Sequence, residues 1–111
     1  MHAFDVLGDP VRRRILEMLA EERLSAGDIA AVIAEEFGIS HAAVSQHLKV
    51  LRESGFATVR ANKNHRIYEL QPTPMREVDN WLDQFRHFWT HRLEALATEV
   101  ARGKKSRHNS D

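Results

Sequence analysis

The chain of 111 residues carries 16 Lys and Arg against 16 Asp and Glu, a formal net charge of zero, and 42% of its residues are hydrophobic. This balance is typical of one ordinary globular domain and excludes a disordered or fibrous chain. The absence of cysteine excludes disulfides, thiolate metal sites and a cysteine nucleophile. No stretch resembles a secretion signal or approaches the roughly 18 apolar residues of a membrane span, so we expect a cytoplasmic protein. At face value, zero net charge also argues against a nucleic-acid partner.

The N-terminal part of the chain has the signals of an amphipathic helix. Asp9 followed by Pro10 is typical of a helix start, and apolar residues at helical spacing follow as far as Leu19. The apolar segment 4–7 before it, interrupted at Gly8, predicts a further short helix.

Two more predicted helices follow, joined by a short turn. Ser25 as a cap and Gly38 as a stop predict a helix over about 25–37. Ser40 and Gly55 bracket the next helix in the same way. Helix, tight turn and helix predict a helix-turn-helix.

The periodicity then changes from helical to alternating. Residues 56–61 and 65–70 are rich in β-forming residues and are separated by the turn-forming residues 62–64, which predicts a β-hairpin.

The last predicted element is one long helix. Thr73 and Pro74 are typical of a helix start, and apolar residues at spacings of three and four follow for about 28 residues. The segment 102–111 is basic and has nothing to bury, so we expect a disordered tail after a domain that spans 1–101. The predicted fold is mainly α with a β-hairpin wing, an α+β winged helix-turn-helix with a long C-terminal dimerisation helix.

The helix after the tight turn has two distinct faces. If Val44, Leu48 and Leu51 face the core, helical geometry turns a set of short or hydrogen-bonding side chains outward: His41, Ala42, Ser45, Gln46 and Lys49. In a helix-turn-helix the second helix enters the major groove of DNA. This helix is therefore the candidate recognition helix.

The outward side chains suit contacts with double-stranded DNA. Gln46, Ser45 and His41 can hydrogen-bond to base edges, and Ala42 can lie against a thymine methyl group. Ser40, together with the free N–H groups of the helix start, suits a phosphate. The alternative is that Ser40 is only a cap and Gln46 only a solvated residue, which a single isolated helix would favour.

Residues 40–52 read SHAAVSQHLKVLR and lead into Ser54-Gly55-Phe56. This stretch closely resembles the recognition helix of the ArsR family of winged helix-turn-helix repressors. Residues 4–16 resemble that family's opening and 66–70 resemble the returning strand of its wing, so the resemblance covers roughly residues 3 to 100. It implies a homodimer that binds a palindromic operator and represses transcription, often of its own operon. We predict that Arg52 belongs to the DNA-binding set.

The predicted hairpin has a polar and basic tip over 62–66. We expect Lys63 and Arg66, helped by Arg60, to contact phosphates or the minor groove. The alternative is a solvated turn, because Asn and Lys are common in turns for conformational reasons. His47 flanks the inward face of the recognition helix, so a structural hydrogen bond is at least as well supported there as a base contact.

Four of the eight aromatic residues lie in one stretch of nine residues inside the last predicted helix: Trp81, Phe85, Phe88 and Trp89. A helix of about 28 residues is roughly 42 Å long. A compact domain of this size has a radius of gyration of about 13 Å, so one end of the helix should extend beyond the core of the monomer. We expect these aromatic residues and Leu93 to pair with the same helix of a second chain, with Phe4 and Leu7 alongside. A small-molecule pocket is the competing use, and nothing in the sequence selects a ligand.

Metal sensing is the main alternative function that the resemblance raises. In many ArsR-like proteins a cysteine pair precedes the recognition helix, but Ser25 and Gly27 stand at those places here, which excludes that thiolate site. A second site of the family uses Asp, His and Glu on the last helix, where this chain has Asp83, His87, His91 and Glu94 without the family's Asp-x-His spacing. We predict no metal and no other cofactor.

Two further classes of function compete with a DNA-binding regulator. An enzyme would need a nucleophile motif, a Gly-rich phosphate loop or paired acids, and the sequence has none of them, so we predict that the protein is not an enzyme. A winged helix that binds protein would carry an acidic or apolar recognition surface, and residues 40–52 show neither.

The zero net charge hides an uneven distribution. Residues 40–70 hold five Lys and Arg against two Asp and Glu, a charge of +3, and residues 102–111 also sum to +3. Residues 1–39 sum to −4 and residues 71–101 to −2. The basic part coincides with the proposed recognition helix and wing, so net neutrality does not argue against DNA binding.

Overall fold

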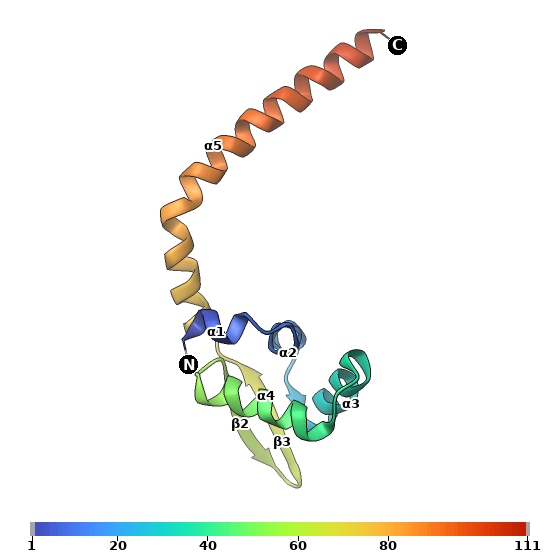
Figure 1. Cartoon of the computed structure of the whole chain (residues 1–111), viewed down its shortest axis with the longest axis vertical. Coiled ribbons are helices and arrows are strands. Elements are labelled where there is room, and N and C mark those ends of the chain that lie inside the picture. Colours follow the sequence, from blue (N-terminus) through green and yellow to red (C-terminus); the bar gives the residue numbers. More distant parts are fainter. Residues whose placement is uncertain (1, 111) are drawn as a thin grey trace. The chain divides into compact units, whose positions relative to one another are not determined.

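The computed structural model describes the backbone of residues 2–110 and the side chains of residues 2–101. Its elements, in chain order, are α1 (Ala3–Leu7), α2 (Pro10–Glu21), β1 (Leu24–Ser25), α3 (Ala26–Phe37), α4 (His41–Glu53), β2 (Ala57–Asn62), β3 (His65–Leu70) and α5 (Thr73–Ser110) (Figure 1). The predicted helices and hairpin are therefore confirmed, and two elements differ from expectation.

Side-chain caps explain where the helices of the first part begin. The Asp9 carboxylate accepts hydrogen bonds from the N–H groups of Val11 at 2.8 Å and Arg12 at 3.2 Å, which starts α2. The Ser25 hydroxyl accepts from the N–H of Asp28 at 3.0 Å and starts α3 in the same way. Each cap satisfies N–H groups that have no partner inside the first turn of a helix.

The tight turn between α3 and α4 depends on one glycine. Gly38 ends α3 in the left-handed conformation, with φ of +64°. A residue without a Cβ adopts this conformation at the lowest cost, so the chain can reverse within three residues and begin α4.

Three antiparallel strands form the sheet, in the order β1-β3-β2. The hairpin of β2 and β3 is in register from Ala57 opposite Leu70 to Asn62 opposite His65. The third strand, β1, pairs Leu24 with Tyr68 and was not expected from the sequence. A strand of two residues is too short to show the alternation by which strands are recognised, and only pairing with β3 defines it.

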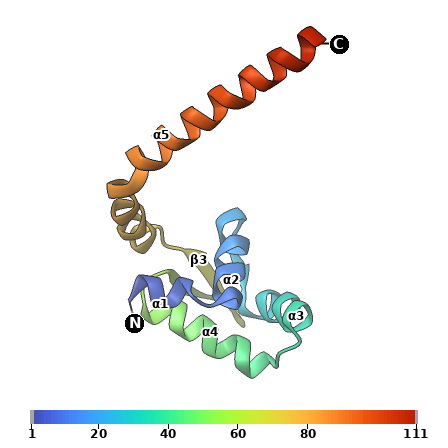
Figure 2. The same ribbon diagram turned by 45° about the horizontal axis from the view of Figure 1, so that its top comes forward.

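One hydrophobic core joins α1, α2, α3, α4 and the sheet. Its largest fully buried side chains are Phe56, Ile15, Ile29, Ile33, Leu51, Val6 and Val44. α4 packs against α2, α3 and β2, and Figure 2 shows this group of helices from a second direction. α4 is therefore held from its inner side, which leaves its outer side available.

The backbone divides into two compact units, residues 1–78 and 79–111. The sequence places the division near residue 101 and ends the last helix near residue 100, whereas α5 continues to Ser110. The predicted end of the helix is therefore wrong, whereas the division into a domain over 1–101 and a tail stays a prediction. Lack of apolar residues argues against burial, but helical hydrogen bonds are local and need no buried face. No helix in the described part of the chain is long and apolar enough to cross a membrane.

Candidate nucleic-acid interface

The outer face of α4 carries the side chains that the sequence predicts to be there. Val44, Leu48 and Leu51 are buried in the core. The five residues predicted to face outward are all exposed: His41, Ala42, Ser45, Gln46 and Lys49. Arg52, one turn further along α4, is half-buried. The two faces are thus confirmed, and contact of the outer face with DNA stays a prediction.

Ser40 is the N-cap of α4, as expected. Its hydroxyl accepts a hydrogen bond from the N–H of Ala43 at 3.1 Å, and the residue is exposed. Capping leaves other N–H groups of the first turn without helical partners, and such groups at a helix start can bind an anion. The cap and the phosphate-binding interpretations of Ser40 are therefore compatible.

A groove of about 310 Å³ lies between α4 and β3. We refer to it as the α4–β3 groove, and it is lined by Ala26, Ser45, Gln46, Leu48, Lys49, Arg52, Arg66 and Tyr68. It brings Arg66 of the wing together with the outer face of α4. Four of the predicted DNA-binding side chains besides Arg66 meet in this one place, although the helix and the strand are separated by the whole of β2.

The hairpin tip presents Lys63 in an unusual backbone conformation. Lys63 is exposed and has a φ of +57°, the left-handed region that costs a residue with a Cβ. Its side chain does not line the α4–β3 groove. The two predicted wing contacts, Lys63 and Arg66, therefore belong to two different places on the wing.

Arg60 lies on the opposite face of the hairpin. Its Nη2 forms an ion pair with Glu69 Oε2 at 3.6 Å. Both side chains line another groove, of about 330 Å³, together with Arg23 and Thr58. The structure therefore does not bring Arg60 together with the residues of the α4–β3 groove.

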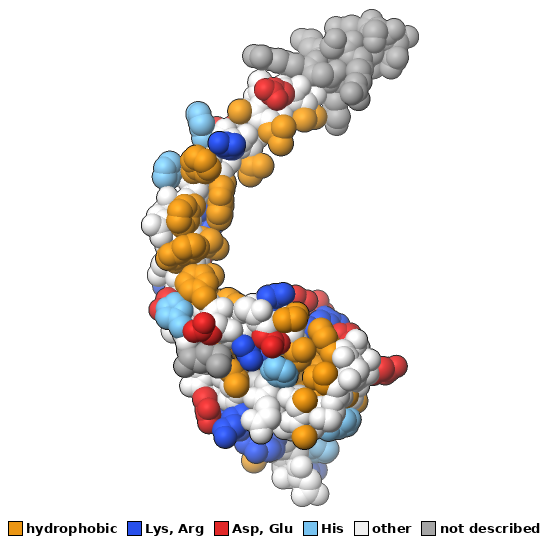
Figure 3. All heavy atoms as spheres, in the orientation of Figure 1, with side chains coloured by type: hydrophobic (Ala, Val, Ile, Leu, Met, Phe, Trp, Pro, Cys, Tyr) orange, Lys and Arg blue, Asp and Glu red, His pale blue; other side chains and the backbone are white. Residues whose placement is uncertain are grey.

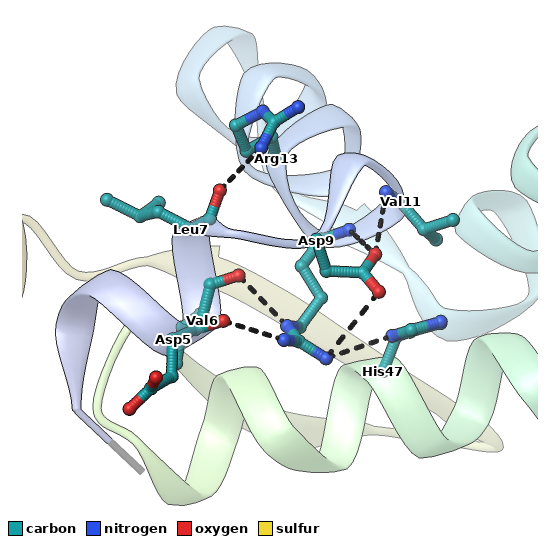
Figure 4. A network of polar contacts seen from close by, with 8 residues as sticks. Asp5, Val6, Leu7, Asp9, Val11, Arg13 and His47 are labelled. Carbon is teal, nitrogen blue, oxygen red and sulfur yellow. Dashed lines mark hydrogen bonds and ion pairs between the residues drawn. The ribbon is translucent and has the colours of Figure 1, made fainter.

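Arg12 links α1 to α4. Its partners Asp5, Val6, Asp9 and His47 are labelled in Figure 4. Its Nε donates to the carbonyl of Val6 at 3.0 Å, and its Nη2 donates to the carbonyl of Asp5 at 2.9 Å. Its Nη1 lies 3.5 Å from Nδ1 of His47 and 3.9 Å from Asp9 Oδ2. The half-buried His47 thus contacts α2, in agreement with the structural role that the sequence left open for it.

The cap residue Asp9 is electrostatically stabilised as a carboxylate. Burial opposes its ionisation, but hydrogen bonds from the N–H groups of Arg12 and Val11 and the electrostatic effect of His47 outweigh burial. The pKa of Asp9 is therefore lowered from its ordinary value of 3.8. Stability that depends on the ionised form is present at neutral pH and is lost in acid.

α5 exposes a row of large apolar side chains (Figure 3). Within residues 79–101, those predicted to lie in a dimer interface are exposed by 37% to 62%: Trp81, Phe85, Phe88, Trp89 and Leu93. The ring of Phe85 lies 4.9 Å from that of Trp81 and 6.4 Å from that of Trp89. Leu96 and Val100 continue the row, each at least half exposed.

The two predicted interface residues of α1 differ in burial. Phe4 is 39% exposed and its ring stacks on that of His2 at 5.4 Å. Leu7 is half-buried and packs against the core of the first unit. Their place in a dimer stays a prediction.

The candidate metal ligands of the last helix do not gather into a site within one chain. The Asp83 carboxylate accepts from Nε of Arg86 at 2.7 Å. In the described part of the chain, no three His, Asp or Glu side chains are close enough together to hold a metal ion. His87, His91 and Glu94 are exposed along α5.

Sequence reasoning missed one residue that lines the groove, Tyr68, and one that contacts α4 through His47, Arg12. Arg12 sits among three consecutive arginines, and nothing in that run marks which of them contacts α4. Tyr68 had a usable signal, because residues two apart in a strand share a face. Tyr68 follows Arg66 by two, and both line the α4–β3 groove.

Comparisons with known proteins place the chain among regulators of transcription. A family model described as a helix-turn-helix domain matches residues 7–60. The HTH-type transcriptional regulator Rv2034 of Mycobacterium tuberculosis is 37% identical over 95 residues, which cover 86% of this chain and 82% of that protein. The transcriptional repressor SdpR of Bacillus subtilis is 32% identical over 84 residues, 76% of this chain and 89% of that protein.

A solved structure agrees with these relatives. The crystal structure of a possible transcriptional regulator for arsenical resistance superimposes with a TM-score of 0.66 at 32% identity. The match covers 77% of this chain and 84% of that chain.

Proposed function

Because the chain belongs to the ArsR family of winged helix-turn-helix transcriptional regulators, we propose that it is a homodimeric repressor of a palindromic operator. In this proposal α4 enters the major groove of double-stranded DNA and reads base edges. The wing and the α4–β3 groove contact phosphates. The operator lies upstream of the chain's own gene.

One observation carries the proposal: the outer face of α4 is polar, exposed and held on a rigid core. Gln46 and Ser45 are exposed beside Lys49 and line the α4–β3 groove. An amide and a hydroxyl in the N-terminal half of such a helix can hydrogen-bond to base edges, and the lysine can reach a phosphate.

The distribution of charge supports the same surface. Residues 40–70, which contain α4 and the wing, carry a net charge of +3, whereas residues 1–39 carry −4. Positive charge on the side that contacts DNA attracts phosphates, and negative charge elsewhere limits indiscriminate binding.

The dimer is supported by the apolar row on α5. Leu93 is 62% exposed and Phe88 is 53% exposed, and burying them against a second copy removes this apolar surface from water. Pairing about a two-fold axis would present two copies of α4 to half-sites about 34 Å apart, one turn of DNA.

A footprint on the DNA upstream of the chain's own gene tests the proposal. We expect wild-type protein to protect a palindromic site there, and to prefer it to mixed-sequence duplex DNA. Gln46→Ala should lower this preference by about tenfold, because a hydrogen-bonding contact with a base edge is lost.

Gln84→Ala is the matched control, since Gln84 is an exposed glutamine of α5. It should leave the footprint unchanged. A wild-type protein that protects no site, or a Gln46→Ala variant with undiminished preference, would contradict the respective part of the proposal.

A further inference from the structure

Tyr68 lines the α4–β3 groove and carries a hydroxyl that no described residue binds. Only 4% of Tyr68 is exposed, and its ring belongs to the hydrophobic core. Its hydroxyl has no hydrogen-bond partner among the described residues. In the described part of the chain, every fully buried side-chain oxygen or nitrogen has a partner. The hydroxyl is therefore not completely buried, and Tyr68 is one of the residues that line the α4–β3 groove.

The cationic side chains that line this groove form no ion pair in the described part of the chain. Lys49 and Arg52 reach the groove from α4 and Arg66 reaches it from β3. None of the three forms an ion pair with a described residue. No Asp or Glu lines the groove. Three positive charges in one small groove repel one another, and an anion between them removes that repulsion.

The start of α3 adds a further positive contribution. Ala26, the first residue of α3, also lines the groove. The first N–H groups of a helix carry a partial positive charge that attracts anions, and α3 is 12 residues long. The groove thus combines three cations, a helix start and a free hydroxyl donor.

We propose that the α4–β3 groove binds one phosphate of the DNA backbone, with the Tyr68 hydroxyl donating a hydrogen bond to a phosphate oxygen. This inference rests on the proposed DNA binding and assigns to Tyr68 a contact that the sequence did not predict. The phosphate lies beside Ser45 and Gln46, which line the same groove. The contact therefore fixes how far α4 enters the major groove, because phosphate contacts position a protein and base contacts specify its site.

Tyr68→Phe is the decisive variant, because it removes only the hydroxyl and keeps the ring that fills the core. We expect affinity for a mixed-sequence DNA duplex to fall by about tenfold, the effect of one hydrogen bond to a charged group. The midpoint of thermal unfolding should stay unchanged or rise, since the hydroxyl has no partner in the folded chain. Fluorescence anisotropy with a labelled duplex measures the affinity.

The dependence of affinity on salt separates the hydroxyl from the cations. Lys49→Gln should weaken binding and lower the slope of log affinity against log salt by about one, because one fewer counterion is released. Tyr68→Phe should leave that slope unchanged, since the hydroxyl is neutral.

Thr58→Val is the matched control for loss of a wing hydroxyl. Thr58 lies in β2, lines the groove on the other face of the hairpin and accepts a hydrogen bond from Gln71 at 3.2 Å. The affinity of the Thr58→Val protein for the duplex should equal that of wild type.

The outcomes distinguish this inference from the proposed function. A wild-type protein that binds no DNA would overturn both. Wild-type binding with an undiminished affinity of Tyr68→Phe would overturn the phosphate site alone, and so would equal losses in Tyr68→Phe and Thr58→Val.

Discussion

Asp9 combines two roles at the start of α2. Its carboxylate caps the helix through the N–H groups of Val11 and Arg12, and it lies 3.9 Å from the guanidinium of Arg12. The cap is a local interaction, but the side chain of Arg12 also contacts α1 through the Val6 carbonyl and α4 through His47. A single carboxylate therefore supports both the helix and the contact network behind the recognition helix.

We expect Asp9→Ala to lower the free energy of unfolding by about 1 kcal/mol near neutral pH, the usual value of an N-cap. The folded state lowers the pKa of Asp9 from 3.8, so the ionised carboxylate stabilises the protein above that pH. This contribution is lost as the pH falls through the lowered pKa. Urea denaturation of both proteins across acidic pH should show the difference between them shrinking.

Glu35→Ala provides the control for loss of a carboxylate. Glu35 is exposed on α3 and has no ion pair or hydrogen bond with a described side chain. Its effect on stability should be small at every pH. A difference between wild type and Asp9→Ala that does not shrink in acid would show that the charge of Asp9 contributes nothing.

α1 is an element that cannot be stable alone. It has five residues, fewer than an isolated helix needs. Two arginines of α2 bind the carbonyls of its last turn: Arg12 binds those of Asp5 and Val6, and Arg13 binds that of Leu7 at 2.6 Å. These donors satisfy carbonyl groups that no residue within α1 can reach.

Arg12→Gln and Arg13→Gln should differ in their effect on stability, although both remove a cap of α1. The Arg12 side chain is only 12% exposed and also contacts α4 through His47, whereas Arg13 is exposed. We expect Arg12→Gln to lower the free energy of unfolding by about 2 kcal/mol, because the part-buried hydrogen bond to the Val6 carbonyl, the exposed one to the Asp5 carbonyl and the contact with His47 are all lost. Arg13→Gln should cost about 0.5 kcal/mol or less, the range of a surface substitution.

Combining Arg12→Gln with His47→Ala tests the link to the recognition helix. If the two side chains interact, their effects on the free energy of unfolding are not additive. Additive effects, or equal costs for Arg12→Gln and Arg13→Gln in chemical denaturation, would argue against a contribution from the Arg12–His47 contact.

For the whole molecule, we propose that oligomeric state depends on the exposed apolar row of α5. We expect Phe85→Glu to convert the dimer into a monomer, because a charge would have to be buried in an apolar interface. Light scattering gives the mass in solution. Leu93→Glu should act in the same way, which separates the interface from a local effect on one ring cluster.

Gln84→Glu is the matched control, since it places the same charge at an exposed polar position of α5. It should remain a dimer, and circular dichroism should show equal helix content in all three variants. A Phe85→Glu protein with the mass of a dimer would refute the proposed interface.

The start of α4, the end of α3 and the two faces of α4 were predictable from the sequence because the signals for them are local. Ser40 begins α4 and Gly38 ends α3 through interactions that span at most four residues. The helical period turns Val44 inward and Gln46 outward. The predicted end of α5 was wrong because a lack of apolar residues predicts absence of burial and does not by itself end a helix.

The sequence by itself determined the helix starts, the two faces of α4, the hairpin and the uneven charge behind a net charge of zero. Only the tertiary structure decided that β1 pairs with β3, that Arg12 reaches His47 35 positions away, and that Tyr68 lines one groove with three cationic side chains. The physical reason is range. Caps and periodicities act over a few neighbouring residues, whereas these contacts depend on how separate elements pack.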